Sequence, residues 1–159
     1  MGIKSYQDLE VWQKAMDLVV LCYKTAESFP QKEVYGLTSQ LQRAAVSIPA
    51  NIAEGRQRQY SKEFLQYLSV AYGSLAELET HSHIARRVGY IKDDQLNEIL
   101  EKTSEIGRML NGLRKSIEIS GSRVQGSVVR EQGSGLREQG SKIGDRGTGI
   151  RGQGPGRTK

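Results

Sequence analysis

A helical pattern with a proline inside it constrains this chain more than any other segment. Between Gln40 and Gly55 the sequence reads QLQRAAVSIPANIAEG. Apolar residues recur at three- and four-residue spacing, which places them on one face of a helix: Leu37, Leu41, Ala44, Ile48 and Ile52. Pro49 removes a backbone donor and crowds the carbonyl group four residues earlier, yet the pattern continues past it. We therefore predict a kinked helix that Gly55 ends in the left-handed conformation.

The same segment carries a polar stripe. At 100° per residue, five side chains fall within an arc of about 80°: Gln40, Arg43, Ser47, Asn51 and Glu54. One interpretation is a solvated helix face. The other is a polar network that another subunit or a ligand covers. The second interpretation predicts partly buried side chains that bond to one another or to a neighbouring chain, since an unpaired buried charge is costly.

The first helix is predicted over residues 6–28, with Ser5 and Asp8 in a capping arrangement. Its bundle seam is predicted to be Leu9, Trp12, Met16, Val19, Tyr23 and Ala26. A second apolar stripe follows Val11, Ala15, Leu18 and Cys22. Together the stripes span about 200° of the helical wheel, against about 100° for one core contact. This breadth indicates burial on two sides, and hence oligomerisation.

Three further helices complete the predicted fold. They span about 35–54, then 61–88 with Ser61 as N-cap and Gly89 as terminator, and about 94–119 after a cap at Asp93 or Asp94. The third seam is Phe64, Leu68, Ala71, Leu75 and Leu78, and Gly73-Ser74 is predicted to permit a close helix approach. The fourth seam is Ile99, Thr103, Ile106, Leu110, Leu113 and Ile117. Short loops favour an all-α, antiparallel up-down-up-down four-helix bundle.

The C-terminal segment has a different composition. Residues 1–119 are predicted to form the bundle and residues 120–159 a disordered, Gly/Arg-rich tail, since 11 of the last 39 residues are glycine. Seven-residue units repeat from Ser122 on, either as a translated tandem DNA repeat or as a weak RNA-binding tail. Residues 1–120 hold 15 basic and 15 acidic residues, so the whole net charge of +5 lies in the tail. The basic pI is therefore weak support for nucleic-acid binding by the bundle.

Several separated motifs resemble one known family. They are YQDLEVWQKAMDLV, YGLTSQLQRAAVSIPANIAEG, R-x-x-x-x-EFLQYLSVAYGSLAELE from Arg58 on, and GYIKDDQLNEILEKTSEIGRMLNGL. In this order they resemble the four-helix-bundle family of bacterial 23S rRNA intervening-sequence proteins, over about residues 5–118. The family often has two adjacent arginines where this chain has Gln42-Arg43, which argues against a role that needs both charges.

The resemblance implies a small, non-catalytic helical protein that forms a homopentamer. Members are often encoded inside insertions in large-subunit rRNA genes. The chain is also similar to accessory proteins of diversity-generating retroelements, which bind nucleic acid and a reverse transcriptase. Two hypotheses follow: an oligomer that binds RNA or a nucleic-acid enzyme, and a protein–protein assembly module without nucleic-acid binding.

Residue chemistry gives no positive sign of an enzyme, a cofactor, a metal or a small-molecule substrate. His81 and His83, two apart on a helix, point about 200° from each other and cannot share a metal, although Glu77 and His81 could pair. Cys22 is the only cysteine and is predicted to be a small buried residue, which suits a reducing cytoplasm. No signal peptide or membrane-length apolar run is recognisable.

Candidate nucleic-acid-binding residues are the cations of the predicted bundle: Arg43, Arg56, Arg58, Lys62, Arg86 and Arg87. The loop arginines and the Arg86-Arg87 pair are expected near opposite ends of one antiparallel helix pair. One compact patch per subunit is therefore not expected, but each end could form a ring in a cyclic oligomer. Only Tyr60 accompanies these cations, so base stacking is poorly supported and a solvated surface is the competing interpretation.

Overall fold

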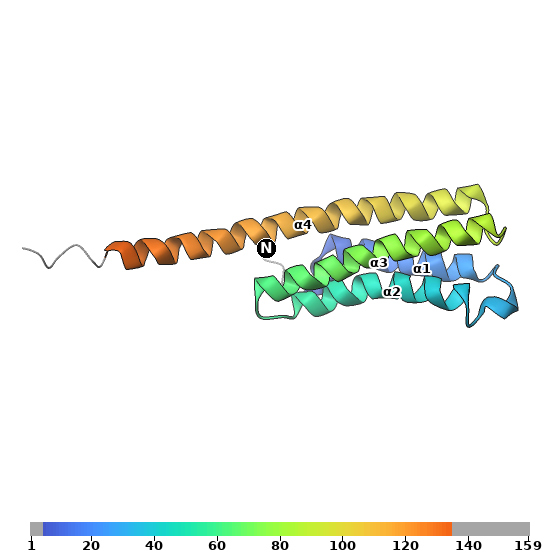
Figure 1. Ribbon diagram of the computed structural model, residues 1–159, viewed down its shortest axis with the longest axis horizontal. Helices are drawn as coiled ribbons and strands as arrows, with labels where there is room; N and C mark the ends of the chain where they lie inside the picture. Colours follow the sequence, from blue (N-terminus) through green and yellow to red (C-terminus); the bar gives the residue numbers. More distant parts are fainter. Residues whose placement is uncertain (1–4, 135–159) are drawn as a thin grey trace, which may run out of the picture. The chain divides into compact units, whose positions relative to one another are not determined.

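The structure is a computed structural model that describes residues 5–134, with side chains described as far as residue 120. Four α-helices follow one another along the chain (Figure 1): α1 Glu10–Ala26, α2 Leu37–Arg56, α3 Ser61–Arg87 and α4 Asp93–Ser134. Two short 3-10 helices, η1 Tyr6–Asp8 and η2 Gln31–Glu33, precede α1 and α2. Residues 5–134 contain no strand. The predicted all-α class is confirmed.

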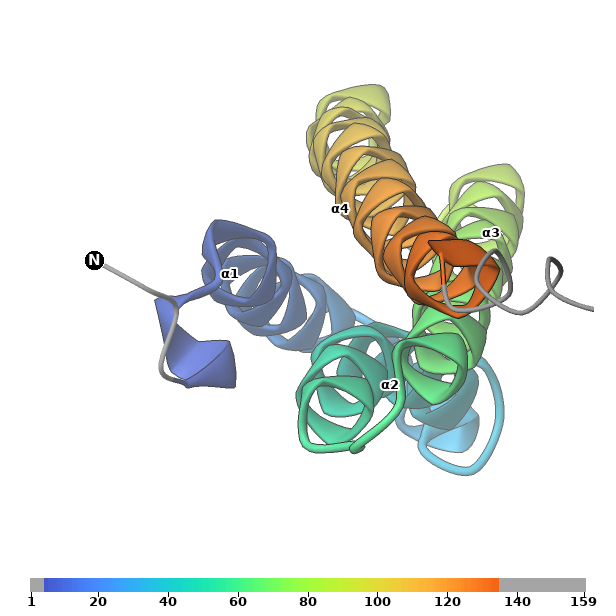
Figure 2. The same cartoon turned by 90° about the vertical axis from the view of Figure 1, so that its left-hand side faces the viewer.

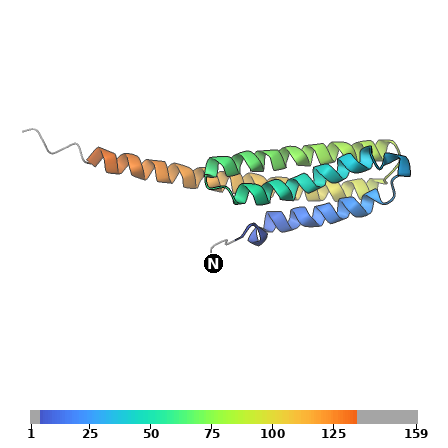
Figure 3. The same ribbon diagram turned by 90° about the horizontal axis from the view of Figure 1, so that it is seen from below.

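Backbone contacts divide the chain into two units, Met1–Val124 and Gln125–Lys159. In the first unit, successive helices run in opposite directions (Figure 3). Seen along the bundle, α2 lies between α1 and α3, and α4 lies beside α3 (Figure 2). An ion pair of 3.0 Å between Lys14 and Glu105 joins α4 to α1 as well. These connections give the predicted up-down-up-down bundle.

The predicted first helix is divided near its beginning. Leu9 takes an extended conformation, φ −76° and ψ 117°, between η1 and α1. The Ser5 hydroxyl accepts a hydrogen bond from the Gln7 amide, while the Ser5 amide donates to Asp8 at 3.0 Å. The capping arrangement is therefore confirmed, but it begins a single 3-10 turn. Leu9, only 6% exposed, then joins the core.

The two apolar stripes exchange roles along the middle of α1, although Leu9 and Ala26 of the predicted seam are buried as predicted. The stripe predicted as secondary forms the core side, because Val11, Ala15, Leu18 and Cys22 are all buried. On the stripe predicted as the seam, Met16 and Tyr23 are 39% and 46% exposed. This assignment was wrong because one helix wheel does not show which side of a broad apolar face meets the neighbouring helices.

Helix α2 continues through Pro49, and its predicted apolar face is inward: Leu41, Ala44, Ile48 and Ile52 are 0–2% exposed. The predicted role of Gly55 was wrong. Gly55 is buried inside α2, and Gly89 is the glycine with a positive φ, 80°, in the described part of the chain. A Cβ atom on Gly55 would lie 2.6 Å from Tyr67 Cβ and 2.8 Å from Phe64 Cδ2. Gly55 therefore lets α3 approach α2 closely.

Helix α3 has the predicted core face, since Phe64, Leu68, Ala71, Leu75 and Leu78 are all buried. It begins at Ser61, with Tyr60 rather than Ser61 in the N-cap position. Gly89 follows its end, as predicted. The close approach predicted at Gly73 was wrong, because a Cβ atom there would meet nothing within 4 Å. The neighbouring Ser74 is the buried contact residue.

Helix α4 begins at Asp93 and buries Ile99, Thr103, Ile106 and Leu110, with Leu113 and Ile117 packed at its edge. It continues to Ser134, beyond the predicted end at residue 119. Extending an existing helix adds one hydrogen bond per residue without a new nucleation cost, which offsets part of the glycine penalty. The remainder of the predicted disordered tail, residues 135–159, lies outside the described residues.

Candidate interaction surface

An apolar face is exposed on one side of the bundle. Met16, Val20 and Tyr23 lie at four- and three-residue spacing on α1. Val34 and Tyr35 follow η2, and Tyr35 is 96% exposed. Val46 on α2 is also exposed. We call these six residues the α1–α2 face. An isolated exposed apolar residue needs no explanation, but a group of this size is typical of an interaction surface.

The α1–α2 face contains a hollow of about 570 Å³. Its lining comes from α1, the segment after η2, and α2: Tyr23, Val34, Tyr35, Ser39, Gln42, Arg43, Val46 and Ser47. Arg43 is the only charged residue in this lining. Among the side chains of residues 5–120, Arg43 has no hydrogen-bond or ion-pair partner. The hollow therefore combines apolar walls with one uncompensated positive charge.

The side of the bundle formed by α4 has the opposite character. Among the α4 side chains described, Ile119 is the only large apolar one that is exposed. Residues such as Asn97, Glu101 and Arg108 face solvent instead. The Lys14–Glu105 ion pair lies between α1 and this helix. The unpartnered apolar surface is thus confined mainly to the sides formed by α1, α2 and α3.

The predicted polar stripe contacts α3 through Ser47 and Glu54, while Arg43 lies in the hollow. Ser74 donates a 2.9 Å hydrogen bond to the Ser47 hydroxyl, and the Asn51 amide donates to that hydroxyl at 3.0 Å. Ser47 and Asn51 are half-buried, whereas Gln40, Arg43 and Glu54 are exposed. The stripe therefore has partners in its own chain. Burial of its exposed members by another subunit stays a prediction.

Glu54 belongs to a three-residue cluster at the end of α2. The Tyr67 hydroxyl donates to a Glu54 carboxylate oxygen at 2.8 Å. Arg58 donates to both Glu54 and Tyr67, and its guanidinium carbon lies 4.9 Å from the centre of the Tyr67 ring. The Tyr67 hydroxyl and the Arg58 guanidinium lower the pKa of the Glu54 carboxyl. Through Arg58 and Tyr67, the cluster connects the α2–α3 loop to α3.

Sequence reasoning missed Tyr67 and Ser74 as partners of the stripe. Both pairs, Ser47 with Ser74 and Glu54 with Tyr67, lie symmetrically about residues 60 and 61. That symmetry follows from an antiparallel register. The symmetry could predict these pairs from the sequence only if the position of the loop and the facing sides of both helices were already known.

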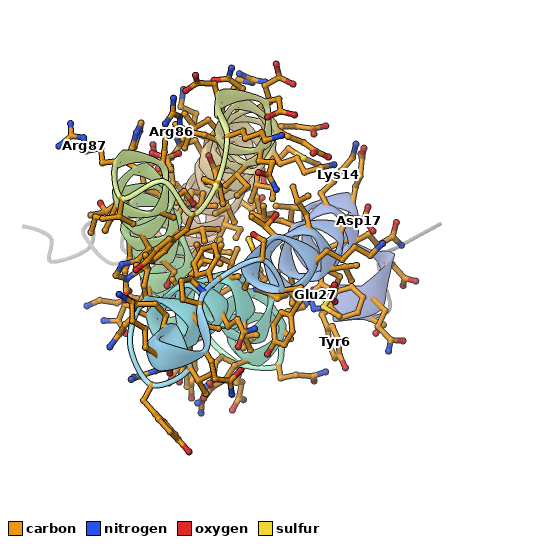
Figure 4. The ribbon with its side chains drawn as sticks, turned by 90° about the vertical axis from the view of Figure 1, so that its right-hand side faces the viewer. Tyr6, Lys14, Asp17, Glu27, Arg86 and Arg87 are labelled. Atoms are coloured by element: carbon orange, nitrogen blue, oxygen red, sulfur yellow. The ribbon has the colours of Figure 1, made fainter. Side chains whose placement is uncertain are left out.

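The candidate nucleic-acid-binding residues are divided between the two ends of α3. Arg56, Arg58 and Lys62 surround the α2–α3 loop, whereas Arg86 and Arg87 end α3 (Figure 4). Arg56 is half-buried and has an interaction partner, and Lys62 is exposed. Arg43 lies apart, in the hollow. The structure thus brings together three of the six cations at one end and two at the other.

Two of these arginines are neutralised within the chain. Arg86 donates to both carboxylate oxygens of Asp93, which raises the pKa of Arg86 and lowers the pKa of Asp93. Arg58 pairs with a single Glu54 oxygen and also donates to the Tyr67 hydroxyl. Arg87 instead is exposed and points away from the bundle (Figure 4). Asp93, which was predicted as a possible cap of α4, serves as this ion-pair partner.

A carboxylate also connects the beginning of α2 to the α3–α4 turn. Glu33 accepts a hydrogen bond from the Leu37 amide at 3.0 Å through one oxygen and from the Tyr90 hydroxyl at 3.0 Å through the other. The Leu37 amide and then the Tyr90 hydroxyl lower the pKa of Glu33. Glu33 therefore supplies the side-chain cap that Gly36, the N-cap residue of α2, lacks.

Stability is expected to fall in acid because the pKa of Glu33 is lowered in the folded state. Its contribution is present above the unfolded pKa, about 4.3, and is lost as the pH falls through the folded value. Urea unfolding at several pH values between 7 and 3 should show this loss. In the Glu33→Gln variant, the free energy of unfolding should decrease less steeply between pH 7 and pH 3. If the free energy of unfolding depends on pH equally in the variant and in the original chain, ionised Glu33 does not contribute to stability as proposed.

The cysteine and histidine side chains do not form a catalytic or metal-binding arrangement in the described part of the chain. Cys22 is buried as predicted, and burial raises the pKa of its thiol to about 12. His81 Nε2 lies 3.5 Å from a Glu77 oxygen, an ion pair only when the imidazole is protonated, and neither ring nitrogen has a hydrogen-bond partner among the described residues. Within the described residues, no three metal-ligating side chains gather into a site, and no helix is long and apolar enough to span a membrane.

The fold and its surface define a class of protein: a four-helix bundle with exposed apolar residues on α1, α2 and α3. Residues 7–112 match the profile of the 23S rRNA-intervening sequence protein family, so the chain belongs to that family. A crystal structure of a protein with unknown function from the S23 ribosomal protein family of Bacteroides thetaiotaomicron is similar, with a TM-score of 0.62 and 25% identity. The match covers 66% of this chain and 95% of the other. No curated protein matches.

Proposed function

We propose that this protein is a non-enzymatic assembly module that forms a cytoplasmic homo-oligomer through its α1–α2 face. The observation that carries the proposal is the exposure of Met16, Val20 and Tyr23 on a helix whose opposite side is already buried in the core. Covering these residues removes apolar area from water at about 25 cal/mol per Å². The family resemblance favours five copies. The lone buried thiol of Cys22 suits a reducing compartment.

The test is a charge placed in the α1–α2 face. Val20→Asp should leave the monomer folded, since the side chain is exposed there, but should dissociate the oligomer because the new carboxylate would be buried without a partner. Asn97→Asp on the polar α4 side is the matched control. Sedimentation velocity should show an oligomer for the original chain and the control, and a monomer for Val20→Asp. An original chain that stays monomeric at about 100 μM, near the range expected for a weak complex, would refute assembly.

A second candidate function is binding of RNA through the cations at the bundle ends. Lys62 and Arg87 are exposed, and they support this function by offering charge to phosphates from opposite ends of α3. The pairing of Arg58 and Arg86 with carboxylates reduces the charge available. Binding would then be weak in one subunit and would depend on rings of cations in an oligomer.

RNA binding is expected to be independent of sequence and to weaken steeply with salt, since phosphate contacts release counterions. Titrations with a labelled RNA should compare the full chain, a chain truncated after residue 119, and the truncated chain with Arg56 and Arg58 changed to alanine. Binding that survives truncation and falls with the alanines would assign it to the bundle. Binding that disappears with the truncation would assign it to the tail and leave assembly as the function.

A further inference from the structure

The α3 helix carries an exposed stripe that complements the α1–α2 hollow in charge and in apolar character. Val70, Glu77 and Ile84 follow one another at seven-residue spacing, and all three are exposed. This spacing places them on one line along the helix. We call these residues the α3 stripe. It offers two aliphatic side chains with a carboxylate between them.

The hollow is lined from α1, the segment after η2 and α2, whereas the α3 stripe lies on the next helix of the bundle. Tyr23 on α1 and Val46 on α2 line the hollow, and Ser47, another lining residue, bonds Ser74 of α3. Figure 2 shows α2 between these two neighbours. One copy of the chain thus presents a cationic apolar hollow and, beyond α2, an acidic aliphatic stripe.

Charge decides which surface can enter the hollow. Arg43 is the hollow's only charged lining residue and has no partner among the side chains of residues 5–120. An apolar surface that covered Arg43 without supplying a carboxylate would leave a buried unpaired charge, which costs far more than an exposed one. Glu77 is 53% exposed, and its one ionic contact is His81 at 3.5 Å, so its carboxylate can still accept from a guanidinium.

We propose that the α3 stripe of one copy packs into the α1–α2 hollow of another copy, with Glu77 accepting hydrogen bonds from the partner's Arg43. Val70 and Ile84 then cover the hollow's valine and tyrosine side chains. This inference rests on the proposed self-assembly and adds the partner surface and the residue pair that fixes its register. It also gives Arg43 a role that needs one arginine only.

The test uses charge reversals, singly and mixed. Arg43→Glu and Glu77→Arg should each raise the dissociation constant of the oligomer by about tenfold or more, since each places like charges together. Glu98→Arg, an exposed reversal on the polar α4 side, should leave it unchanged. When the two single variants are mixed in equal amounts, opposite charges meet again at every contact between unlike copies. Association should then recover in sedimentation experiments at least as far as mixed dimers, although a ring of five would keep one contact between identical copies.

The mixing arm separates a contact between copies from one within a chain. If the mixture stays as weak as each variant alone while the double variant assembles, the pair acts within a chain and the proposal is overturned. Assembly of Arg43→Glu with unchanged affinity would also overturn it, while leaving self-assembly through the α1–α2 face intact. A monomeric original chain would instead remove the proposed function and this inference together. Circular dichroism of each variant checks that the helices remain folded.

Discussion

Replacing Gly55 with alanine should lower the free energy of unfolding by about 2 kcal/mol, although alanine is the better helix former. The added Cβ atom would lie 2.6 Å from Tyr67 Cβ and 2.8 Å from Phe64 Cδ2. The Tyr67 Cβ atom is bonded directly to the α3 backbone and cannot rotate away, so this overlap is relieved only if α3 moves away from α2. That movement would also weaken the hydrogen bond from Tyr67 to Glu54. Urea unfolding followed by circular dichroism measures the loss.

Gly73→Ala is the matched control for this prediction. Gly73 also lies inside a helix, but a Cβ atom there would meet nothing within 4 Å. The substitution should therefore stabilise the protein by up to about 1 kcal/mol, because alanine restricts the unfolded chain and favours the helix. Opposite signs at the two glycines would confirm the close approach of α2 and α3 at Gly55. Stabilisation by both alanines would show that α3 can shift at little cost.

The architecture was predictable because its signal is local. Helix type and order follow from three- and four-residue apolar spacing, and the end of α3 follows from Gly89. The uses of Gly55 and Gly73 were not predictable, since they depend on which glycine faces the neighbouring helix. The pattern along one helix shows that a residue is small, but it does not show whether that residue faces a neighbouring helix.

The candidate site was predictable in composition but not in partnership. The polar stripe of α2 was visible as an arc on a helical wheel, and the breadth of the apolar surface of α1 indicated burial on two sides. Its partners Ser74 and Tyr67 lie 27 and 13 residues further along the chain from the stripe residues that they bond. Pairing at such separation depends on the register of α2 and α3, which no local pattern specifies.

The exchanged stripes of α1 lead to the second large effect. Leu18 is fully buried, so Leu18→Ala should remove about 2–5 kcal/mol from the free energy of unfolding, through lost transfer energy and the cavity left behind. Met16 is 39% exposed within one chain, so Met16→Ala should cost less than about 1 kcal/mol in the isolated subunit. A wheel drawn from the sequence alone predicts the reverse order, since it places Met16 in the seam.

Protein concentration distinguishes the two positions further. Stability gained from association rises with concentration by mass action, whereas core packing contributes equally at any dilution. Leu18→Ala should therefore shift the urea midpoint at every concentration. Met16→Ala should shift it mainly at concentrations where the original chain is assembled, and the shift should shrink on dilution. A Met16→Ala shift that is large and independent of concentration would place Met16 in the subunit core and remove one of the three helix residues on which the proposed α1–α2 interface rests.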